Sequence, residues 1–349
     1  MIQILSVGYD VIYEDIVSYL LSQADKHNIS LLEPDTTYER KLIKKQFRWI
    51  NPCAEIGLMA AKHAFDNFSV NSLQSCKNSD EWGVYAGTAY GGMLVTQKEI
   101  CESIAAGGFE NILPSHTIHS GYSFTAEVIA TQYSISGAIY TYVDGSFSSG
   151  IALIQAIDDI AFGKVKNAVV IGNEFIDDDL RTMYRALQPE CESLNSGACC
   201  LLLGEEQDES YEVEEAPKIK YIDLSYQESQ AGKINCKERI RSTLNQSLNN
   251  TNLESDNIDL IIFVHNGNPN IENDFYRGYW EVFKNGKNSK QQVINLYQCF
   301  GYMIGASIAF SIGIASALLK SDLPVRKMEN IMVLSVDEKG KLMNVVIGR

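Results

Sequence analysis

The segment Val143–Gly150, with the sequence VDGSFSSG, has the surroundings that best suit a catalytic residue. The pattern predicts that a buried strand runs into it and an amphipathic helix runs out of it. A tight turn between a strand and a helix often carries a nucleophile, and the dipole at the helix N-terminus can lower the pKa of a thiol there. The position at which we expect that nucleophile is Phe147, whose ring cannot attack a carbonyl. The scaffold therefore looks catalytic, but the site lacks its reactive group.

Two other nucleophiles stay open as alternatives. A shift of one residue in the turn would place Ser146 at its apex, although the spacing to Ser148–Gly150 favours Phe147. Cys299 is a second candidate. Either would need a base, and His265, at a loop mouth after a predicted strand, is the residue that could serve.

Composition narrows the class of protein. The chain has 349 residues, 45% of them hydrophobic and 21% charged, as is usual for a packed globular protein. Its net charge of −15 argues against nucleic acid and anionic membrane as partners, because both require positive charge. The longest apolar run, Met303–Leu319, is interrupted by Gly and Ser, and it predicts a buried helix rather than a membrane span.

The cysteines and the first residues indicate the compartment. Eight cysteines occur without CxxC spacing, and Cys199 and Cys200 are adjacent within a predicted strand. The first eight residues predict a strand rather than a secretory signal peptide. We therefore expect reduced thiols in a cytoplasmic protein.

The apolar runs alternate between strand and helix patterns throughout the chain. Predicted strands cover residues 1–8, 84–87, 139–143, 168–172, 197–203, 219–224, 260–264, 292–296, 331–336 and 342–347. Predicted helices cover residues 13–27, 52–68, 152–161 and 236–249, with a buried helix after Gly301. The acidic segment 204–218 is interpreted as a seam between two layered α/β halves, residues 1–205 and 216–349.

In order and spacing these motifs resemble the β-ketoacyl synthases of the thiolase-like superfamily. The matching stretches are residues 83–92 (Gly-Thr-Gly-x-Gly-Gly turn), 135–150 (Thr-Ala-Cys-Ser-Ser-Gly elbow), 170–174 (Ala-Gly-Gly-Ala-Glu), 195–198 (Gly-Glu-Gly-Ala), 265–274 (His-Gly-Thr-Gly-Thr…Asn-Asp) and 300–306 (Thr-Gly-His-Leu-Leu-Gly-Ala). The resemblance implies an α/β thiolase-like fold with two similar βαβ halves in five layers, α-β-α-β-α.

The departures from the family pattern carry the functional argument. Such enzymes hold the acyl chain on a cysteine and use two histidines for decarboxylation and for the oxyanion. By resemblance, the cysteine position is Phe147, the first histidine remains as His265, the second is Tyr302, and a lysine position is Tyr297. The family's C-terminal Gly-Phe-Gly-Gly-Thr-Asn loop is replaced by residues 337–342. Losing the nucleophile and a base would cost many orders of magnitude in rate.

A ketosynthase-like chain without its cysteine resembles above all a chain-length factor, the β subunit of a type II polyketide ketosynthase. The resemblance implies an inactive subunit that forms a heterodimer with an active ketosynthase. It would help to set the length of the polyketide carried by the phosphopantetheine of an acyl carrier protein, with no cofactor of its own. The cysteine position is typically Gln in that class, so Phe147 departs even from it. The alternatives are a stand-alone acyltransferase or condensing enzyme using Ser146 or Cys299 with His265, and a scaffold that only stabilises its partner.

The resemblance also implies two surfaces. Residues 113–124 would lie at the subunit interface, where the bulk of His116, Tyr122 and Phe124 would limit chain length; an ordinary packed helix is the competing interpretation. His116 and His119 lack a third ligand, so we predict no metal site.

The predicted strand at residues 139–143 would pair with its counterpart in the partner. The interface residues would be Ile139, Tyr140, Thr141, Tyr142 and Val143. Because carrier proteins of such systems are themselves acidic, the carrier should dock mainly on a more basic partner subunit.

Overall fold

The computed structural model describes residues 1–10, 47, 50–68, 79–206, 216–226, 236–283, 292–320, 327–337 and 339–349. The strands are β1 (Ile2–Asp10), β2 (Trp82–Gly87), β3 (Ile139–Tyr142), β4 (Asn167–Glu174), β5 (Gly197–Glu205), β6 (Lys218–Ser225), β7 (Leu260–Val264), β8 (Gln292–Asn295), β9 (Asn330–Val336) and β10 (Leu342–Gly348). The α-helices are α3 (Pro52–Asn67), α4 (Met93–Gly107), α5 (Pro114–His119), α6 (Phe124–Tyr133), α7 (Ser148–Ala161), α8 (Asp178–Leu187), α9 (Cys236–Thr251), α10 (Pro269–Phe283), α11 (Leu296–Phe300) and α12 (Ser307–Lys320).

The strands form one continuous sheet whose two halves repeat a single pattern. Its order is β3-β2-β4-β5-β1-β6-β10-β9-β7-β8. In the first half β2 is parallel to β3 and β4, and β5 is antiparallel to β4 and β1. In the second half β7 is parallel to β8 and β9, and β10 is antiparallel to β9 and β6. Residues Ile2 and Gln3 of β1 pair with Ile219 and Lys218 of β6, which joins the halves.

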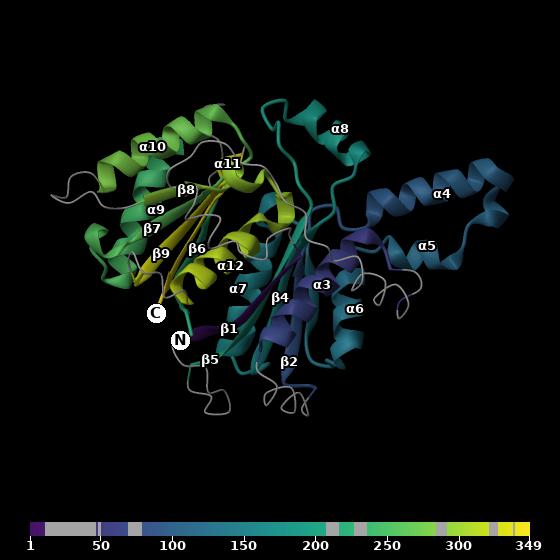
Figure 1. Ribbon diagram of the computed structural model, residues 1–349, viewed down its shortest axis with the longest axis horizontal. Helices are drawn as coiled ribbons and strands as arrows, with labels where there is room; N and C mark the ends of the chain where they lie inside the picture. Colours follow the sequence, from purple (N-terminus) through teal and green to yellow (C-terminus); the bar gives the residue numbers. More distant parts are fainter. Residues whose placement is uncertain are drawn as a thin grey trace.

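Helices cover both faces of each half, which gives the five predicted layers (Figure 1). One outer core lies between α3, α6 and the first half of the sheet, and the other lies between α9, α10 and the second half. The largest core surrounds α7 and α12, which lie between the two halves. Alternate residues on β4 serve different layers: Val169 and Ile171 face outward, while Val170 faces the centre. This two-sided burial explains the continuous apolar runs.

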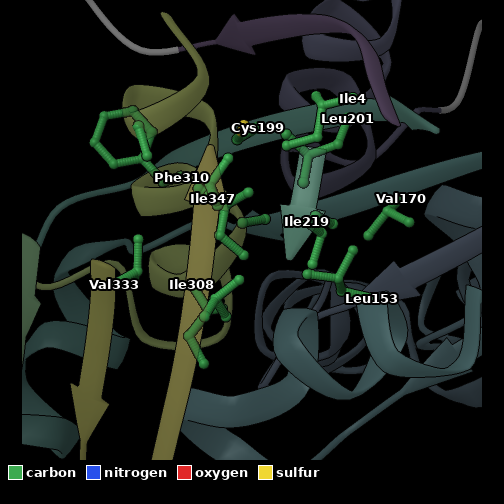
Figure 2. Packing of buried hydrophobic residues seen from close by; sticks show 14 of the residues in the cluster. Ile4, Leu153, Val170, Cys199, Leu201, Ile219, Ile308, Phe310, Val333 and Ile347 are labelled. Carbon is green, nitrogen blue, oxygen red and sulfur yellow. The ribbon is translucent and has the colours of Figure 1, made fainter. Parts of the chain in front are cut away.

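Figure 2 shows the central core close up. Ile308 and Phe310 of α12 and Leu153 of α7 meet side chains from strands of both halves, including Leu201 and Val333, and all are buried. The predicted buried helix is therefore α12, although residues 303–306 form a turn before it.

Most predicted elements are present, with one correction. The strand before the Phe147 turn was expected to be buried, but β3 pairs only with β2 and lies at the sheet edge. Its residues Ile139 and Tyr140 are 41% and 39% exposed. The predicted helix at residues 13–27 lies outside the described residues.

Two further expectations from the sequence concern the seam between the halves and membrane-spanning helices. Most of the predicted seam also lies outside the described residues, so the division at 205 and 216 stays a prediction. No helix in the described ranges is long and apolar enough to cross a bilayer.

Helices α4 and α5 project from the body as an arm (Figure 1). Within α4 the side chain of Thr96 is buried, and α5 buries none. Phe109, Leu113 and Ile118 on this arm are 76%, 43% and 61% exposed. The arm therefore presents apolar side chains that the described part of the chain does not cover.

Gly8 of β1 tests how closely the first strand packs on α3. A Cβ at this position would overlap the backbone oxygen of Ala60 and the backbone nitrogen of Ala64. Overpacking costs about 1–3 kcal/mol. Because helix backbone cannot rotate away, we expect Gly8→Ala to lower the free energy of unfolding by about 3 kcal/mol in urea denaturation. Gly121→Ala is the matched control, since its nearest atoms would lie 3.4 Å and 3.6 Å away; equal stability of the two variants would contradict the packing.

Candidate functional site

The turn between β3 and α7 is closed by the backbone and by Ser148. Gly145 has φ +55°, a left-handed conformation that favours glycine, and a short 3₁₀ helix, η3 (Gly145–Phe147), follows. The Ser148 hydroxyl donates to the Gly145 carbonyl (2.7 Å) and accepts from the Asp144 N–H (2.9 Å). Phe147 is fully buried in the central core, whereas Ser146 is half-buried. The predicted nucleophile position therefore holds a packing residue.

An ion pair from the other half of the chain covers this turn. Lys341, just before β10, lies 2.7 Å and 2.8 Å from the two carboxylate oxygens of Asp144. Its Nζ also lies 6.0 Å from the centre of the Phe147 ring. The Asp337 carboxylate accepts the N–H groups of Lys339 and Lys341, which holds the β9–β10 turn in this position. The segment that replaces the family's C-terminal loop thus lies over the altered turn.

His265 is buried, and both of its ring nitrogens are engaged. Nδ1 accepts from the Gly267 N–H at 3.2 Å, which assigns the proton to Nε2, 3.1 Å from the Asn295 side-chain oxygen. Burial lowers the pKa of His265 to about 4, and the bond to Asn295 only partly opposes this shift. The imidazole is therefore neutral at pH 7, with both nitrogens committed to structural bonds.

The positions of the second histidine and the lysine hold buried or half-buried tyrosines. Tyr302 is 2% exposed, and its ring lies 6.2 Å from that of Tyr184. The Tyr297 hydroxyl accepts from the backbone N–H groups of Glu192 (3.0 Å) and Ser193 (3.1 Å). The Tyr297 ring also lies 5.4 Å from that of His265. The structure thus brings Tyr297 close to His265, but neither Tyr297 nor Tyr302 supplies the amine or the second imidazole of the family pattern.

Neither alternative nucleophile has the surroundings of an activated one. Burial raises the pKa of Cys299 to about 11, so its thiol stays protonated at pH 7. No imidazole among the described residues hydrogen-bonds to Ser146, and both nitrogens of His265 are already engaged.

Glu174, the last residue of β4, is a buried acid for which the sequence predicted no role. Its carboxylate accepts the N–H groups of Ala89 (2.7 Å), Tyr90 (3.0 Å) and Gly305 (3.3 Å), and the Thr88 hydroxyl (3.3 Å). It therefore joins the glycine-rich turn after β2 to η5 (Ile304–Ala306), the 3₁₀ turn before α12. Burial raises its pKa to about 7, although these hydrogen bonds oppose the shift. In the sequence, the position of an acidic residue at the end of the apolar run 168–172 could have indicated that Glu174 has a special role.

The predicted chain-length residues lie at the foot of the arm. The Tyr122 hydroxyl lies 3.5 Å from the sulfur of Met93, and the rings of His119 and Phe124 lie 4.6 Å apart. His116 is half-buried on α5. In the described ranges, no group of three or more His, Cys, Asp or Glu could hold a metal ion.

The predicted interface residues lie on the free edge of the sheet. Ala138 and Tyr142 direct their carbonyls toward β2, bonding to the N–H groups of Val84 and Thr88. Because backbone direction alternates along a strand, the N–H groups of Ile139 and Thr141 face away from β2. Tyr140 is held by Lys164, which also pairs with Asp159.

Comparisons with known proteins agree with this geometry. Residues 20–184 match the family model for the N-terminal domain of β-ketoacyl synthases. No significant match to a curated protein was found.

Several solved structures resemble the whole chain. A type II polyketide synthase acyl carrier protein in complex with its ketosynthase bound to the hexaketide (AntDE:AntF) has a TM-score of 0.79 at 15% identity, covering 99% of this chain and 98% of that one. The ishigamide ketosynthase/chain length factor gives 0.77 at 12% identity, covering 99% of each chain. The ketosynthase ApeO in complex with its chain length factor ApeC, from Xenorhabdus doucetiae, gives 0.74 at 16% identity, covering 99% and 97%. At these identities the likeness establishes the fold alone, and the predicted thiolase-like fold is confirmed.

Glu174 should make stability depend on pH. Its pKa is raised from 4.5 to about 7, so the folded state holds the proton more tightly than the unfolded state. The stabilising contribution is fully present below pH 4.5 and is lost as the pH rises through 7. We expect the wild type to gain up to about 3 kcal/mol over Glu174→Gln between pH 8 and pH 4.5. Denaturation of both proteins across this range measures the difference, in which His265 and other common groups cancel; a constant difference would contradict the assignment.

Proposed function

We propose that this chain, whose residues 20–184 match the model of the β-ketoacyl synthase N-terminal domain, is a non-catalytic, cytoplasmic subunit of chain-length-factor type. The observation that carries the proposal is Phe147, fully buried where the attacking sulfur is expected. His265 supports it, because a neutral imidazole with both nitrogens bonded is not poised to move a proton. A stand-alone acyltransferase using Ser146 or Cys299 is less well supported, because the Cys299 thiol is protonated at pH 7 and both nitrogens of His265 are already bonded.

The proposed partner is an active ketosynthase, bound at the edge of β3. An unpaired strand edge is a template for another strand, and natural proteins cover or charge such edges. Here the edge strand itself presents exposed apolar side chains: Ile139 is 41% exposed, and Val143, the residue after β3, is 48% exposed. Two of the similar structures are described as a ketosynthase with a chain length factor. The heterodimer would extend the sheet through β3 into the partner.

The proposed cargo is an acyl chain on the phosphopantetheine of an acyl carrier protein. A similar structure is described as a type II polyketide synthase carrier protein with its ketosynthase. Because this chain has a net charge of −15, an acidic carrier would meet repulsion here and dock mainly on the partner. This subunit would act through the bulk of His116, Tyr122 and Phe124.

Thr141→Pro tests the strand-edge interface. Proline removes the N–H that faces away from β2, so the variant should lose a bond to the partner strand while it keeps the pairing with β2. We expect co-purification with the partner ketosynthase to fall sharply. Thr141→Val keeps the N–H and the side-chain shape, and it should bind normally. Undiminished binding by Thr141→Pro, in a chain whose melting temperature is unchanged, would argue against pairing at this edge.

Phe124→Ala tests the role in chain length. Removing the ring should open space beside His119, and the products of the reconstituted synthase should shift toward longer chains, as mass spectrometry would show. Tyr133→Ala is the control, because Tyr133 lies at the other end of α6, stacked on Phe65 at 3.9 Å. An unchanged product distribution for Phe124→Ala, with the heterodimer intact, would refute a chain-length role for this residue.

A further inference from the structure

The turn that ends α7 places a lysine beside the edge strand β3. Helix α7 ends at Ala161, and Gly163 follows with φ +70°, the left-handed conformation that favours glycine at a helix end. The Lys164 N–H donates to the carbonyl of Asp159 at 2.8 Å, which turns the chain back along the helix. The Lys164 ammonium thereby lies 2.6 Å from the Tyr140 hydroxyl of β3 and 3.1 Å from the Asp159 carboxylate.

Asp159 forms the buried end of this cluster, with its side chain 8% exposed. One carboxylate oxygen accepts from the Tyr85 hydroxyl at 2.8 Å and pairs with Lys164, and the other accepts from the Gln155 side chain at 2.8 Å. Burial alone would raise the pKa of Asp159, but these bonds lower it overall, so the carboxylate is charged at pH 7. The acceptor of the cluster is therefore enclosed and already bonded to donors of this chain.

The exposed end of the cluster consists of hydrogen-bond donors. The Lys164 side chain is 46% exposed, and its bonds to Tyr140 and Asp159 raise its pKa, which keeps the ammonium charged. An ammonium has three protons, and a tyrosine hydroxyl that accepts one bond still has its own proton to donate. Within the described part of the chain, no group accepts that proton from Tyr140. We call the Lys164 ammonium and the Tyr140 hydroxyl the donor pair.

Covering β3 with another strand would remove water from the donor pair. A buried donor without an acceptor is unfavourable, so the covering surface must supply an acceptor. A carboxylate suits best, because it can accept from two donors at once and its charge is opposite to that of the ammonium. The Tyr140 ring is already held in place, 5.9 Å from the Tyr85 ring and 4.6 Å from the Lys164 nitrogen. Little ordering is therefore needed on binding.

A second copy of this chain does not offer the required acceptor. Strand β3 is four residues long, so Tyr140 lies close to the axis of any antiparallel pairing of β3 with itself. In a two-fold interface the same surface patch faces itself. Two donor pairs would then approach each other, each with a positive charge and no free acceptor. Charge complementarity therefore favours a different chain with an acidic side chain at this position.

We propose that the donor pair binds a carboxylate of the partner ketosynthase, an aspartate or glutamate that lies opposite Tyr140 when the partner strand pairs with β3. This inference rests on the proposed function, and it adds the chemistry by which the strand edge selects its partner. Tyr140 and Lys164 contact the carboxylate, and Asp159 is a positioning residue that holds Lys164.

Tyr140→Phe removes one donor but keeps the ring and the pairing of Lys164 with Asp159. We expect the dissociation constant of the heterodimer, measured by titration with the partner ketosynthase, to rise about tenfold, because a hydrogen bond to a charged group is lost. Tyr276→Phe, which removes a hydroxyl from α10, is the matched control and should bind as the wild type does. Equal affinities of Tyr140→Phe and the wild type would overturn the inference.

Lys164→Met tests the charge of the donor pair. The variant should bind more weakly, and its affinity should depend less on salt concentration, because an ion pair across the interface is lost. Lys166→Met is the matched control: it removes the same charge two residues away, from a lysine that is 61% exposed and paired with Glu81 at 2.7 Å. An equal loss of affinity in the two variants would assign the effect to overall charge and contradict the proposal.

A double-mutant cycle tests for the carboxylate itself. Each Asp and Glu on the partner's edge strand and its flanking loops is changed to Asn or Gln, alone and together with Tyr140→Phe. At one position we expect the double variant to bind about as weakly as the weaker single variant, which is the mark of a direct contact. Additive losses at every position would overturn the inference. A wild-type chain that binds no ketosynthase would instead refute the proposed function, so the two failures are distinguishable.

Discussion

The burial of α7 and α12 between the two halves of the sheet is the constraint on which the rest of the structure depends. Both helices begin close to β4, and the contact is tight: a Cβ on Gly172 would come within 2.8 Å of the Cβ atoms of Ser149 and Ala309. The Ser149 hydroxyl accepts the Ala309 N–H, which ties the two helix starts together. Each helix follows a tight turn, so fixing the helices also brings η3 and η5 together.

The two turns repeat the same backbone conformation, because each begins with a residue whose φ is positive. Gly145, the first residue of η3, has φ +55°, and Ile304, the first residue of η5, has φ +44°. Glycine adopts this region freely, whereas a non-glycine residue pays roughly 1–2 kcal/mol there. The burial of Ile304 and the bond from the Gly305 N–H to Glu174 offset this strain. A buried carboxylate thus supports the second turn.

The three altered positions share one physical character. Phe147, Tyr297 and Tyr302 each place an aromatic ring where the resembled enzymes have a thiol, an ammonium or an imidazole. Large rings gain stability by burial and contact, and a tyrosine hydroxyl can satisfy backbone groups at the same time. These three positions therefore contribute packing in place of the reactive groups that the resemblance assigns to them. Its surroundings agree, because His265 is neutral and bonded at both nitrogens.

Local pattern in the sequence was enough to predict much of the structure. Apolar runs bounded by turns predict β4, β5, β7, β9 and β10, because strands buried on both faces need side chains that tolerate two cores. The repeated order of elements predicted two α/β halves. The absence of a thiol at position 147 was also visible directly.

Only the tertiary structure decided what surrounds these residues. The strand β3 is exposed because it lies at the edge of the sheet, and its amino-acid sequence does not indicate that position. The bonds of the Tyr297 hydroxyl to the N–H groups of Glu192 and Ser193 join positions 105 and 104 residues apart, and that of Glu174 to Gly305 joins positions 131 apart. Such contacts exist only after distant segments pack together. The sequence alone determined which groups are present, and packing determined which of them are bonded, neutral or enclosed.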